Sequence, residues 1–206
     1  MLDAKTLNNF VKKANHAHQQ FFIWFYTTNA FAEHQQEWGQ QMTEYSGGVG
    51  SKYKNFWPVV IPSLQHIWIL SSARLFIDPP YAPWDKDKLE PRLSLSYILE
   101  LLDDTAFAQS IRDKIKKYDP TIQSLKKLRD NVLAHNDVNF QPGQIDAGIE
   151  DLFEEVESII TDIKQHQTDL QNCINFDLKN TEALSRCGVD EVFEALLKSE
   201  DAVSEQ

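Results

Sequence analysis

The chain has 206 residues, 42% of them hydrophobic and 11% aromatic, a composition typical of a globular protein. This length fits one domain and is enough to bury a core without disulfides or metal ions. Seven glycines and eight prolines supply too few turn residues for an all-β fold. The net charge of −11 excludes a protein that coats nucleic acid indiscriminately, because phosphate contacts require cations.

Residues 1–18 contain no apolar segment of the kind that signal peptides carry. The longest apolar runs, at residues 21–26 and 68–70, are far shorter than a membrane span. We therefore expect a cytoplasmic protein with no membrane association. Cys173 and Cys187 have a poor metal-ligand spacing and are interpreted as structural thiols, so no metal and no cofactor is expected.

In chain order, the first predicted element is a long amphipathic helix over residues 4–38, based on apolar residues at three-and-four spacing. Residues 45–54 contain SGGVGS and are expected to form a loop, without the lysine and threonine of a phosphate-binding loop. Residues 56–77 predict a second helix that is apolar on nearly every side. Such a helix tolerates Pro58 and Pro62 only in or before its first turn.

Asp78 and the two prolines after it end that helix, and the chain to residue 91 is expected to be a loop. Ser94 is the expected N-cap of the next helix, and Asp119-Pro120 interrupts the chain further on. A turn is predicted at residues 140–143. The remaining predicted helices, in chain order, cover residues 95–102, 105–118, 121–136, 145–176 and 189–198.

The pattern predicts an all-α fold, an up-and-down helical bundle with a long acidic helix in its C-terminal part. We expect a single helical domain over residues 1–199 and a frayed acidic tail over residues 200–206. At helical spacing, the large aromatic residues are expected in the core rather than as base-stacking platforms: Trp24, Phe25, Trp57 and Trp68. His16 and His18 are expected on the surface, because two residues apart on a helix they face nearly opposite sides.

Charge is distributed unevenly along the chain. From Arg112 to Arg129 there are seven cations and two acids, whereas from Pro142 to the end there are sixteen acids and four bases. An anionic ligand would be attracted to the basic stretch. Composition alone favours the simpler interpretation, in which these lysines are the solvated faces of two short helices.

One group of residues within this stretch has the chemistry for cleaving RNA without a metal. Arg129 is a fixed cation, His135 titrates near neutrality, and polar side chains such as Asp130 accompany them. In such a reaction a base takes the proton of the 2′-hydroxyl and an acid protonates the leaving oxygen. A cation stabilises the charge that builds on the phosphate, and the arginine fork matches two phosphate oxygens.

Helix geometry favours a site that two chains share. Six residues apart on an α-helix, Arg129 and His135 point about 120° away from each other with a rise of about 9 Å. One chain alone does not obviously place both side chains on one phosphate. If the helix packs against its symmetric copy, two arginines and two histidines can converge along the twofold axis. The geometry therefore predicts a homodimer.

The wider sequence LKKLRDNVLAHND resembles the signature of the HEPN superfamily (higher eukaryotes and prokaryotes nucleotide-binding domains), an arginine followed after four to six residues by a histidine. This segment is most similar to the abortive-infection U-type branch found in bacterial defence proteins. The upstream segments FWPVVIPSLQHIWILSSARLFID and SLSYILELL are also similar to that branch. The resemblance covers residues 56–137.

This resemblance implies an all-helical dimer and, in active members, a metal-independent endoribonuclease in phage defence or a toxin–antitoxin system. Arg129 would then bind and stabilise the phosphate, His135 would act as acid and base, and Asp130 would tune or orient them. The implied partners are RNA, a second copy of the chain, and an antitoxin or other protein. The candidate RNA-binding residues beside this pair are Lys126, Lys127, Asn131 and Asn136.

Two other functions stay open. Many members of the family keep the fold without cleavage, so the chain is also compatible with a non-catalytic module that binds RNA or a protein partner. A purely structural helical dimer is the third interpretation. Arg74 is also open: it either favours the dipole at the C-terminal end of its helix or reaches the cleft as an extra phosphate contact.

Overall fold

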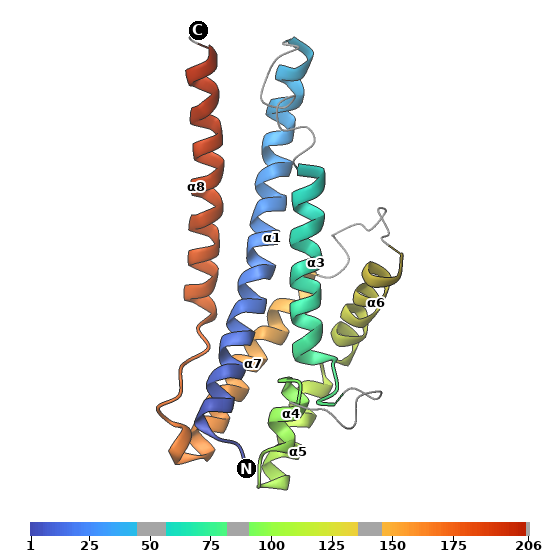
Figure 1. The fold of residues 1–206 in the computed structure, drawn as a ribbon, viewed down its shortest axis with the longest axis vertical. Coiled ribbons are helices and arrows are strands. Elements are labelled where there is room, and N and C mark those ends of the chain that lie inside the picture. Colours follow the sequence, from blue (N-terminus) through green and yellow to red (C-terminus); the bar gives the residue numbers. More distant parts are fainter. Residues whose placement is uncertain (45–56, 82–90, 136–145, 205–206) are drawn as a thin grey trace. The chain divides into compact units, whose positions relative to one another are not determined.

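A computed structural model describes residues 1–44, 57–81, 91–135 and 146–204. All regular structure within these ranges is helical (Figure 1), which confirms the predicted all-α fold. The loop predicted at residues 45–54 and the turn predicted at residues 140–143 lie outside the described residues. The helices are α1 (Ala4–Glu44), α3 (Trp57–Phe76), α4 (Leu95–Glu100), α5 (Thr105–Lys116), α6 (Asp119–His135), α7 (Asp146–His166), the 3₁₀ helix η2 (Thr168–Leu170) and α8 (Leu178–Ser204).

Three predicted helix boundaries were wrong, the first of them the end of α1, which lies at Glu44 rather than at residue 38. The long acidic helix ends at His166 and not at residue 176, because the backbone turns extended at Gln167 (φ −116°, ψ 103°). The chain then folds back on α7, where Lys164 Nζ donates to the Asn175 side chain at 2.6 Å. Leu170, Cys173 and Phe176 are buried at three-residue spacing, which imitates a continuing helix in the sequence. The last helix begins at Leu178 rather than at residue 189 and continues to Ser204.

Helix α3 also differs from its prediction. Pro62 is the sixth residue of the helix and therefore lies beyond its first turn. Since proline has no N–H, the carbonyl of residue 58 loses its helical hydrogen bond there. The window Val59–Phe76 is long and apolar enough to cross a membrane by length and composition alone, and a third of it is buried. Core helices pass the same test, so this window is weak evidence for a membrane span.

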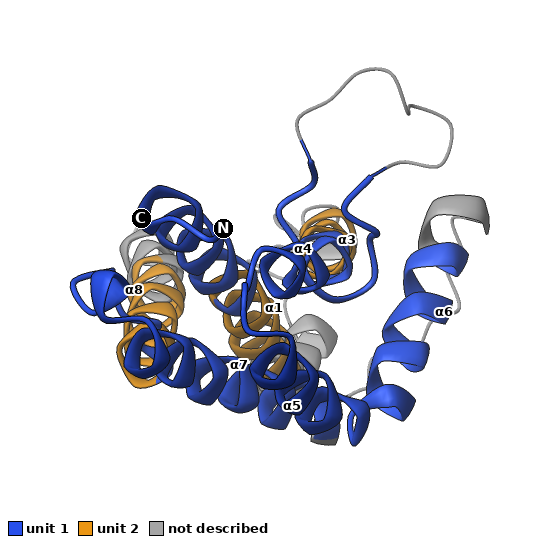
Figure 2. Ribbon diagram, turned by 90° about the horizontal axis from the view of Figure 1, so that it is seen from below, with its two compact units in different colours: residues 1–18, 69–178 blue, residues 19–68, 179–206 orange. Residues whose placement is uncertain are grey.

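The chain divides into two compact units, which Figure 2 distinguishes by colour. Unit 1 contains residues 1–18 and 69–178, and unit 2 contains residues 19–68 and 179–206. In unit 2, Trp24 and Trp68 are 2% and 0% exposed, which confirms their predicted place in the core. The ring centroids of Phe21 and Trp68 lie 5.4 Å apart. The aromatic side chains are thus used for packing, where they contribute buried area and edge-to-face contacts.

Unit 1 is built around α7, whose large apolar side chains from Ile149 to Ile163 are all buried. Asp104 caps α5 by accepting the N–H groups of Ala106 and Phe107, each at 2.9 Å, and the Phe107 bond contributes most to lowering the pKa of this carboxyl. Ser94 caps α4, as predicted. The buried residues of α7 are Ile149, Leu152, Phe153, Val156, Ile159, Ile160 and Ile163.

Ion pairs join α5 to α7. Lys114 pairs with Asp162, and Lys117 pairs with Glu155, which raises the pKa of Lys117 through their hydrogen bond. The imidazole of His166 stacks on Phe107 with 4.0 Å between ring centroids. Two of the seven cations counted in the basic stretch are therefore balanced within the fold by the acidic helix.

A glycine sets the close approach of α6 to α7. A Cβ added at Gly148 would overlap the Thr121 side chain at its Oγ1, with Cγ2 and Cβ also only 3.2 and 3.3 Å away. Rotating the threonine side chain moves Oγ1 away, but its Cβ stays 3.3 Å from the added atom, so the contact remains tight. Gly148 thus allows α6, the helix of Arg129, to lie directly against α7.

We expect Gly148→Ala to lower the free energy of unfolding by about 1–3 kcal/mol, because the added methyl forces the two helices apart. Urea denaturation measures the effect. Gly188 provides the control, because it also lies in a helix and a Cβ there meets nothing within 4 Å. Gly188→Ala should instead stabilise the chain by up to about 1 kcal/mol. Equal effects of the two substitutions would contradict the proposed close approach.

His18 is buried, with 3% of its surface exposed, so its predicted surface position was wrong. Its ring lies 5.0 Å from that of Phe153 and 5.8 Å from that of Phe176, both edge-on. On α1 it lies four residues after Ala14 and therefore belongs to the apolar stripe rather than to the polar face. Burial lowers the pKa of His18 to about 4.

This low pKa predicts a pH-dependent stability. Between pH 6.5, the ordinary histidine pKa, and about pH 4, His18 is protonated in the unfolded chain but neutral in the folded chain. The free energy of unfolding therefore decreases as pH falls through this window, by about 2 kcal/mol between pH 7 and pH 5. His18→Leu should remove this part of the pH dependence, as measured by urea denaturation across that range. His16→Gln, which changes an exposed histidine on the same helix, should leave it intact.

Candidate functional site

Buried neighbouring residues fix the position of Arg129 on α6, and its side chain contacts two carboxylates. Leu125 and Leu128 anchor the helix with 0% and 6% exposure. The Arg129 side chain is 20% exposed. Its Nε and Nη2 donate to Asp130 Oδ1 at 3.0 and 2.8 Å, and its Nη1 donates to Asp78 Oδ1 at 3.0 Å. The guanidinium is thus oriented by two carboxylates, one of which is the predicted Asp130.

Asp78 comes from the segment that ends α3. Its N–H donates to the carbonyl of Ala73 at 3.1 Å, which fixes the chain reversal after the helix. Beyond residues 82–90, which the structure does not describe, the N–H of Arg92 donates to the carbonyl of Pro80 at 2.6 Å. This bond brings the Arg92 side chain back to Asp78, where Nη1 and Oδ2 are 3.4 Å apart. One carboxylate therefore bridges two guanidinium groups, those of Arg92 and Arg129.

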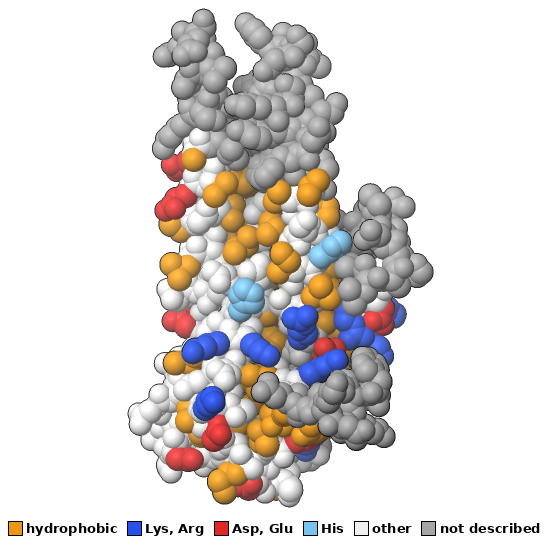
Figure 3. Space-filling model, in the orientation of Figure 1, with side chains coloured by type: hydrophobic (Ala, Val, Ile, Leu, Met, Phe, Trp, Pro, Cys, Tyr) orange, Lys and Arg blue, Asp and Glu red, His pale blue; other side chains and the backbone are white. Residues whose placement is uncertain are grey.

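The surface beside this bridge is hollowed and basic. We call it the basic pocket: a volume of about 380 Å³ lined by Lys13, Arg74, Asp78, Arg92 and Leu93. This volume lies in the range of small-ligand sites. An adjoining hollow of about 280 Å³ shares Lys13 and Arg74 with it and adds Lys12 and His16. Figure 3 shows Lys and Arg side chains gathered in a band across this face.

Sequence reasoning anticipated Arg74 here but missed Lys13 and Arg92. Arg74 is in the last turn of α3, as the dipole interpretation requires, and it also lines the basic pocket. Lys13 and Arg92 lie outside the stretch from Arg112 to Arg129. The pocket cations come from three separate segments, so no local count of charge could have combined them.

The other predicted site residues are placed as follows. Lys126, Lys127, Asp130 and Asn131 are exposed on α6. His135 is the last residue of α6, and only its backbone is described. Asn136 lies outside the described residues. The separation of the Arg129 and His135 side chains therefore stays a prediction.

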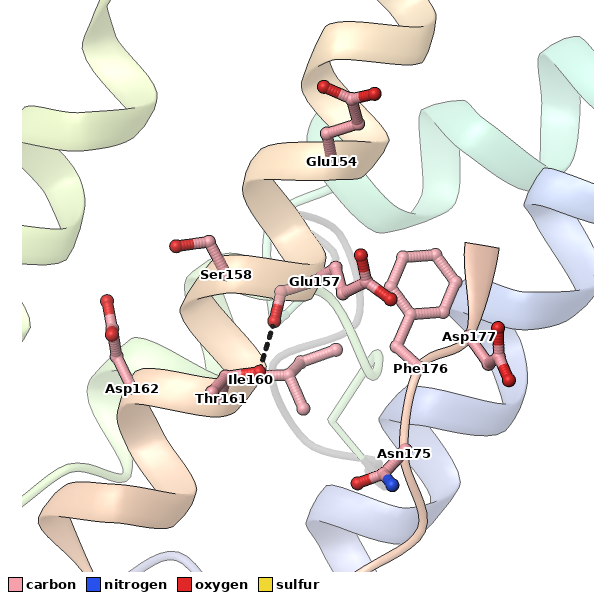
Figure 4. A pocket seen from close by; sticks show the side chains of 9 residues that line it. All are labelled: Glu154, Glu157, Ser158, Ile160, Thr161, Asp162, Asn175, Phe176 and Asp177. Carbon is pink, nitrogen blue, oxygen red and sulfur yellow. Dashed lines mark hydrogen bonds between the residues drawn. The ribbon is translucent and has the colours of Figure 1, made fainter. Parts of the chain in front are cut away.

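A second hollow of unit 1 has the opposite charge. Figure 4 shows it between α7 and the segment that leads into α8, with the side chains of Glu154, Glu157, Asp162 and Asp177 among its lining. Glu157 is half-buried and its Oε1 accepts the N–H of Leu178 at 3.5 Å. Such a surface repels phosphate. Within the described ranges, no three His, Cys, Asp or Glu side chains are grouped so that they could hold a metal ion.

Comparison with protein families gives one result. The family model HEPN AbiU2, described as AbiU2, matches residues 7–191. The match spans most of the chain, so the protein belongs to the AbiU2 family of HEPN proteins. No curated protein matches the chain, and no solved structure matches it. The resemblance inferred for residues 56–137 is thereby confirmed and extended to α1 and most of α8.

Proposed function

We propose that the protein is a metal-independent endoribonuclease of HEPN type that acts in the cytoplasm in bacterial phage defence or as the toxin of a toxin–antitoxin pair. The observation that carries the proposal is the position of Arg129, which borders a basic pocket and lies on the helix that also carries His135. Arg129 binds the scissile phosphate, His135 transfers protons, and Asp130 orients the guanidinium. Lys126, Lys127, Asn131 and Asn136 contact the RNA strand.

The chemistry needs only these groups. The guanidinium stabilises the charge that develops on the phosphate oxygens, and it is already held in place by Asp130. The imidazole takes the proton of the 2′-hydroxyl and returns one to the leaving 5′-oxygen. We propose further that the complete site combines Arg129 of one protomer with the histidine of a second, as the 120° separation along α6 favours.

A second candidate function is a non-catalytic module that binds RNA or a protein partner, including an antitoxin. The observation that favours it is the engagement of Arg129: its Nε, Nη1 and Nη2 all donate to carboxylates of the same chain. A phosphate must compete with Asp78 or Asp130 to reach the guanidinium. The basic pocket does not favour a purely structural dimer, because such a dimer would have no use for it.

Incubation of the pure protein with single-stranded and structured RNA in EDTA separates these functions. A ribonuclease of this type cuts RNA in EDTA, and His135→Ala abolishes the cleavage. A binding module shifts the mobility of RNA equally well with or without His135 and leaves the RNA intact. Cleavage that persists in His135→Ala points to a contaminating nuclease and would contradict the catalytic proposal.

A further inference from the structure

We propose that Lys13, Arg74 and Arg92 form a second phosphate subsite, which holds the RNA backbone next to the phosphate bound at Arg129. This inference rests on the proposed function for its ligand, because it takes the polynucleotide to be RNA. Its own evidence is the basic pocket, in which three cations from α1, α3 and the segment before α4 line one hollow.

The pocket is continuous with Arg129 through Asp78. The two oxygens of this carboxylate divide between Arg129 Nη1 at 3.0 Å and Arg92 Nη1 at 3.4 Å, so both guanidinium groups lie against one anion. A ligand with phosphates in series can therefore touch both. We take this ligand to be one RNA strand with neighbouring phosphates, and the competition experiments below distinguish it from a single small anion.

The cations of the pocket outnumber its acids. Among the described residues, Lys13 and Arg74 form no ion pair, and Asp78 is the only carboxylate that lines the pocket. Asp78 itself is shared between two arginines. By contrast, Lys114 and Lys117 of the basic stretch are already paired with α7. Lys13 and Arg74 are therefore available to an anionic ligand, and they line one hollow together with Arg92.

Asp78 occupies the place that a phosphate oxygen would take between the two arginines. A carboxylate and a phosphate accept the same bidentate donors. RNA must therefore displace this carboxylate at least in part when it binds. Removing the charge of Asp78 while keeping its shape should strengthen binding of the strand.

The test measures binding of a fluorescent 12-nucleotide single-stranded RNA by anisotropy, with the full chain carrying His135→Ala so that no RNA is cut. The added variants are Lys13→Ala with Arg74→Ala, both exposed and unpaired in the described structure. The matched control is Arg112→Ala with Lys116→Ala, two exposed cations of α5 that remove the same charge. Binding is followed from 50 to 300 mM salt.

We expect the pocket pair to weaken binding at least tenfold and to reduce the slope of log affinity against log salt by about 1.4, since each lost contact to a single strand removes about 0.7. The control pair should change the slope by less than half of this amount, and Asp78→Asn should tighten binding several-fold. Equal slopes for the two pairs, or weaker binding by Asp78→Asn, would overturn the subsite.

Two further arms identify the source of the phosphate. Inorganic phosphate and a nucleoside monophosphate are titrated against the same labelled RNA. If either competes at micromolar concentration and loses this ability in the pocket pair, the pocket takes small phosphates, and the strand subsite is wrong. Failure of the proposed nuclease is distinguishable, because absence of cleavage by the unmodified chain leaves the salt slopes of RNA binding unaffected.

Discussion

Replacing Arg129 with alanine should lower the rate of RNA cleavage by about 10²–10³-fold, the usual cost of removing one preorganised donor to a developing negative charge. The measured quantity is the single-turnover rate on a labelled RNA in EDTA. Arg129→Lys should recover only a small part of the rate, because an ammonium cannot reproduce the planar fork that donates to two oxygens at once.

The control for Arg129 is Arg112→Ala, which removes the same charge from an exposed position on α5. It should change the rate less than threefold at moderate salt, where distant exposed charges are screened. Because Arg129 also ties Asp78 to α6, urea denaturation must show that the variant is folded at the assay temperature. Comparable rate losses for Arg112→Ala and Arg129→Ala would remove the argument for a specific phosphate contact.

Mixing two inactive variants should restore cleavage if the site is shared between protomers. Arg129→Ala and His135→Ala chains, unfolded together and refolded, give half mixed dimers. Each mixed dimer has one site with both groups intact, so about one quarter of the native activity should return from a background near zero. The effect is large because neither parent has a complete site.

The mixing experiment carries its own control. Simple addition of the two folded variants without refolding should restore activity only as fast as protomers exchange. If refolded mixtures stay inactive while each variant alone is a folded dimer by gel filtration, Arg129 and His135 act within one chain. The dimeric site would then be wrong even if the ribonuclease activity is real.

Much of the fold was predictable because periodicity reports directly on burial. The apolar stripes of α1 and α7, the cap at Ser94 and the interruption at Asp119-Pro120 placed most helices within a few residues. The misplaced end of α7 has a clear cause: apolar spacing does not distinguish a helix from a return segment that buries every third residue. Leu170, Cys173 and Phe176 are such a segment.

The site was predictable only where its residues are close in the sequence. Arg129 and Asp130 are adjacent in the sequence, and Arg129 donates to the Asp130 carboxylate through Nε and Nη2. The pairing of Arg129 with Asp78 spans 51 residues, and it depends on where α3 ends relative to α6. Arg92 reaches the same carboxylate through a backbone bond to Pro80, for which the sequence contains no signal.

The bridge at Asp78 also has a consequence for how substitutions accumulate among related chains. Since one carboxylate holds both arginines, loss of Asp78 leaves two guanidinium groups facing each other across an empty position. In such a chain, losing Arg92 as well removes this repulsion. In a chain that keeps Asp78, keeping Arg92 preserves the ion pair. Positions 78 and 92 should therefore vary together across relatives, more closely than either varies with the neighbouring Arg74. The bridge between Asp78 and the two arginines would in this way leave a record of paired changes among related chains.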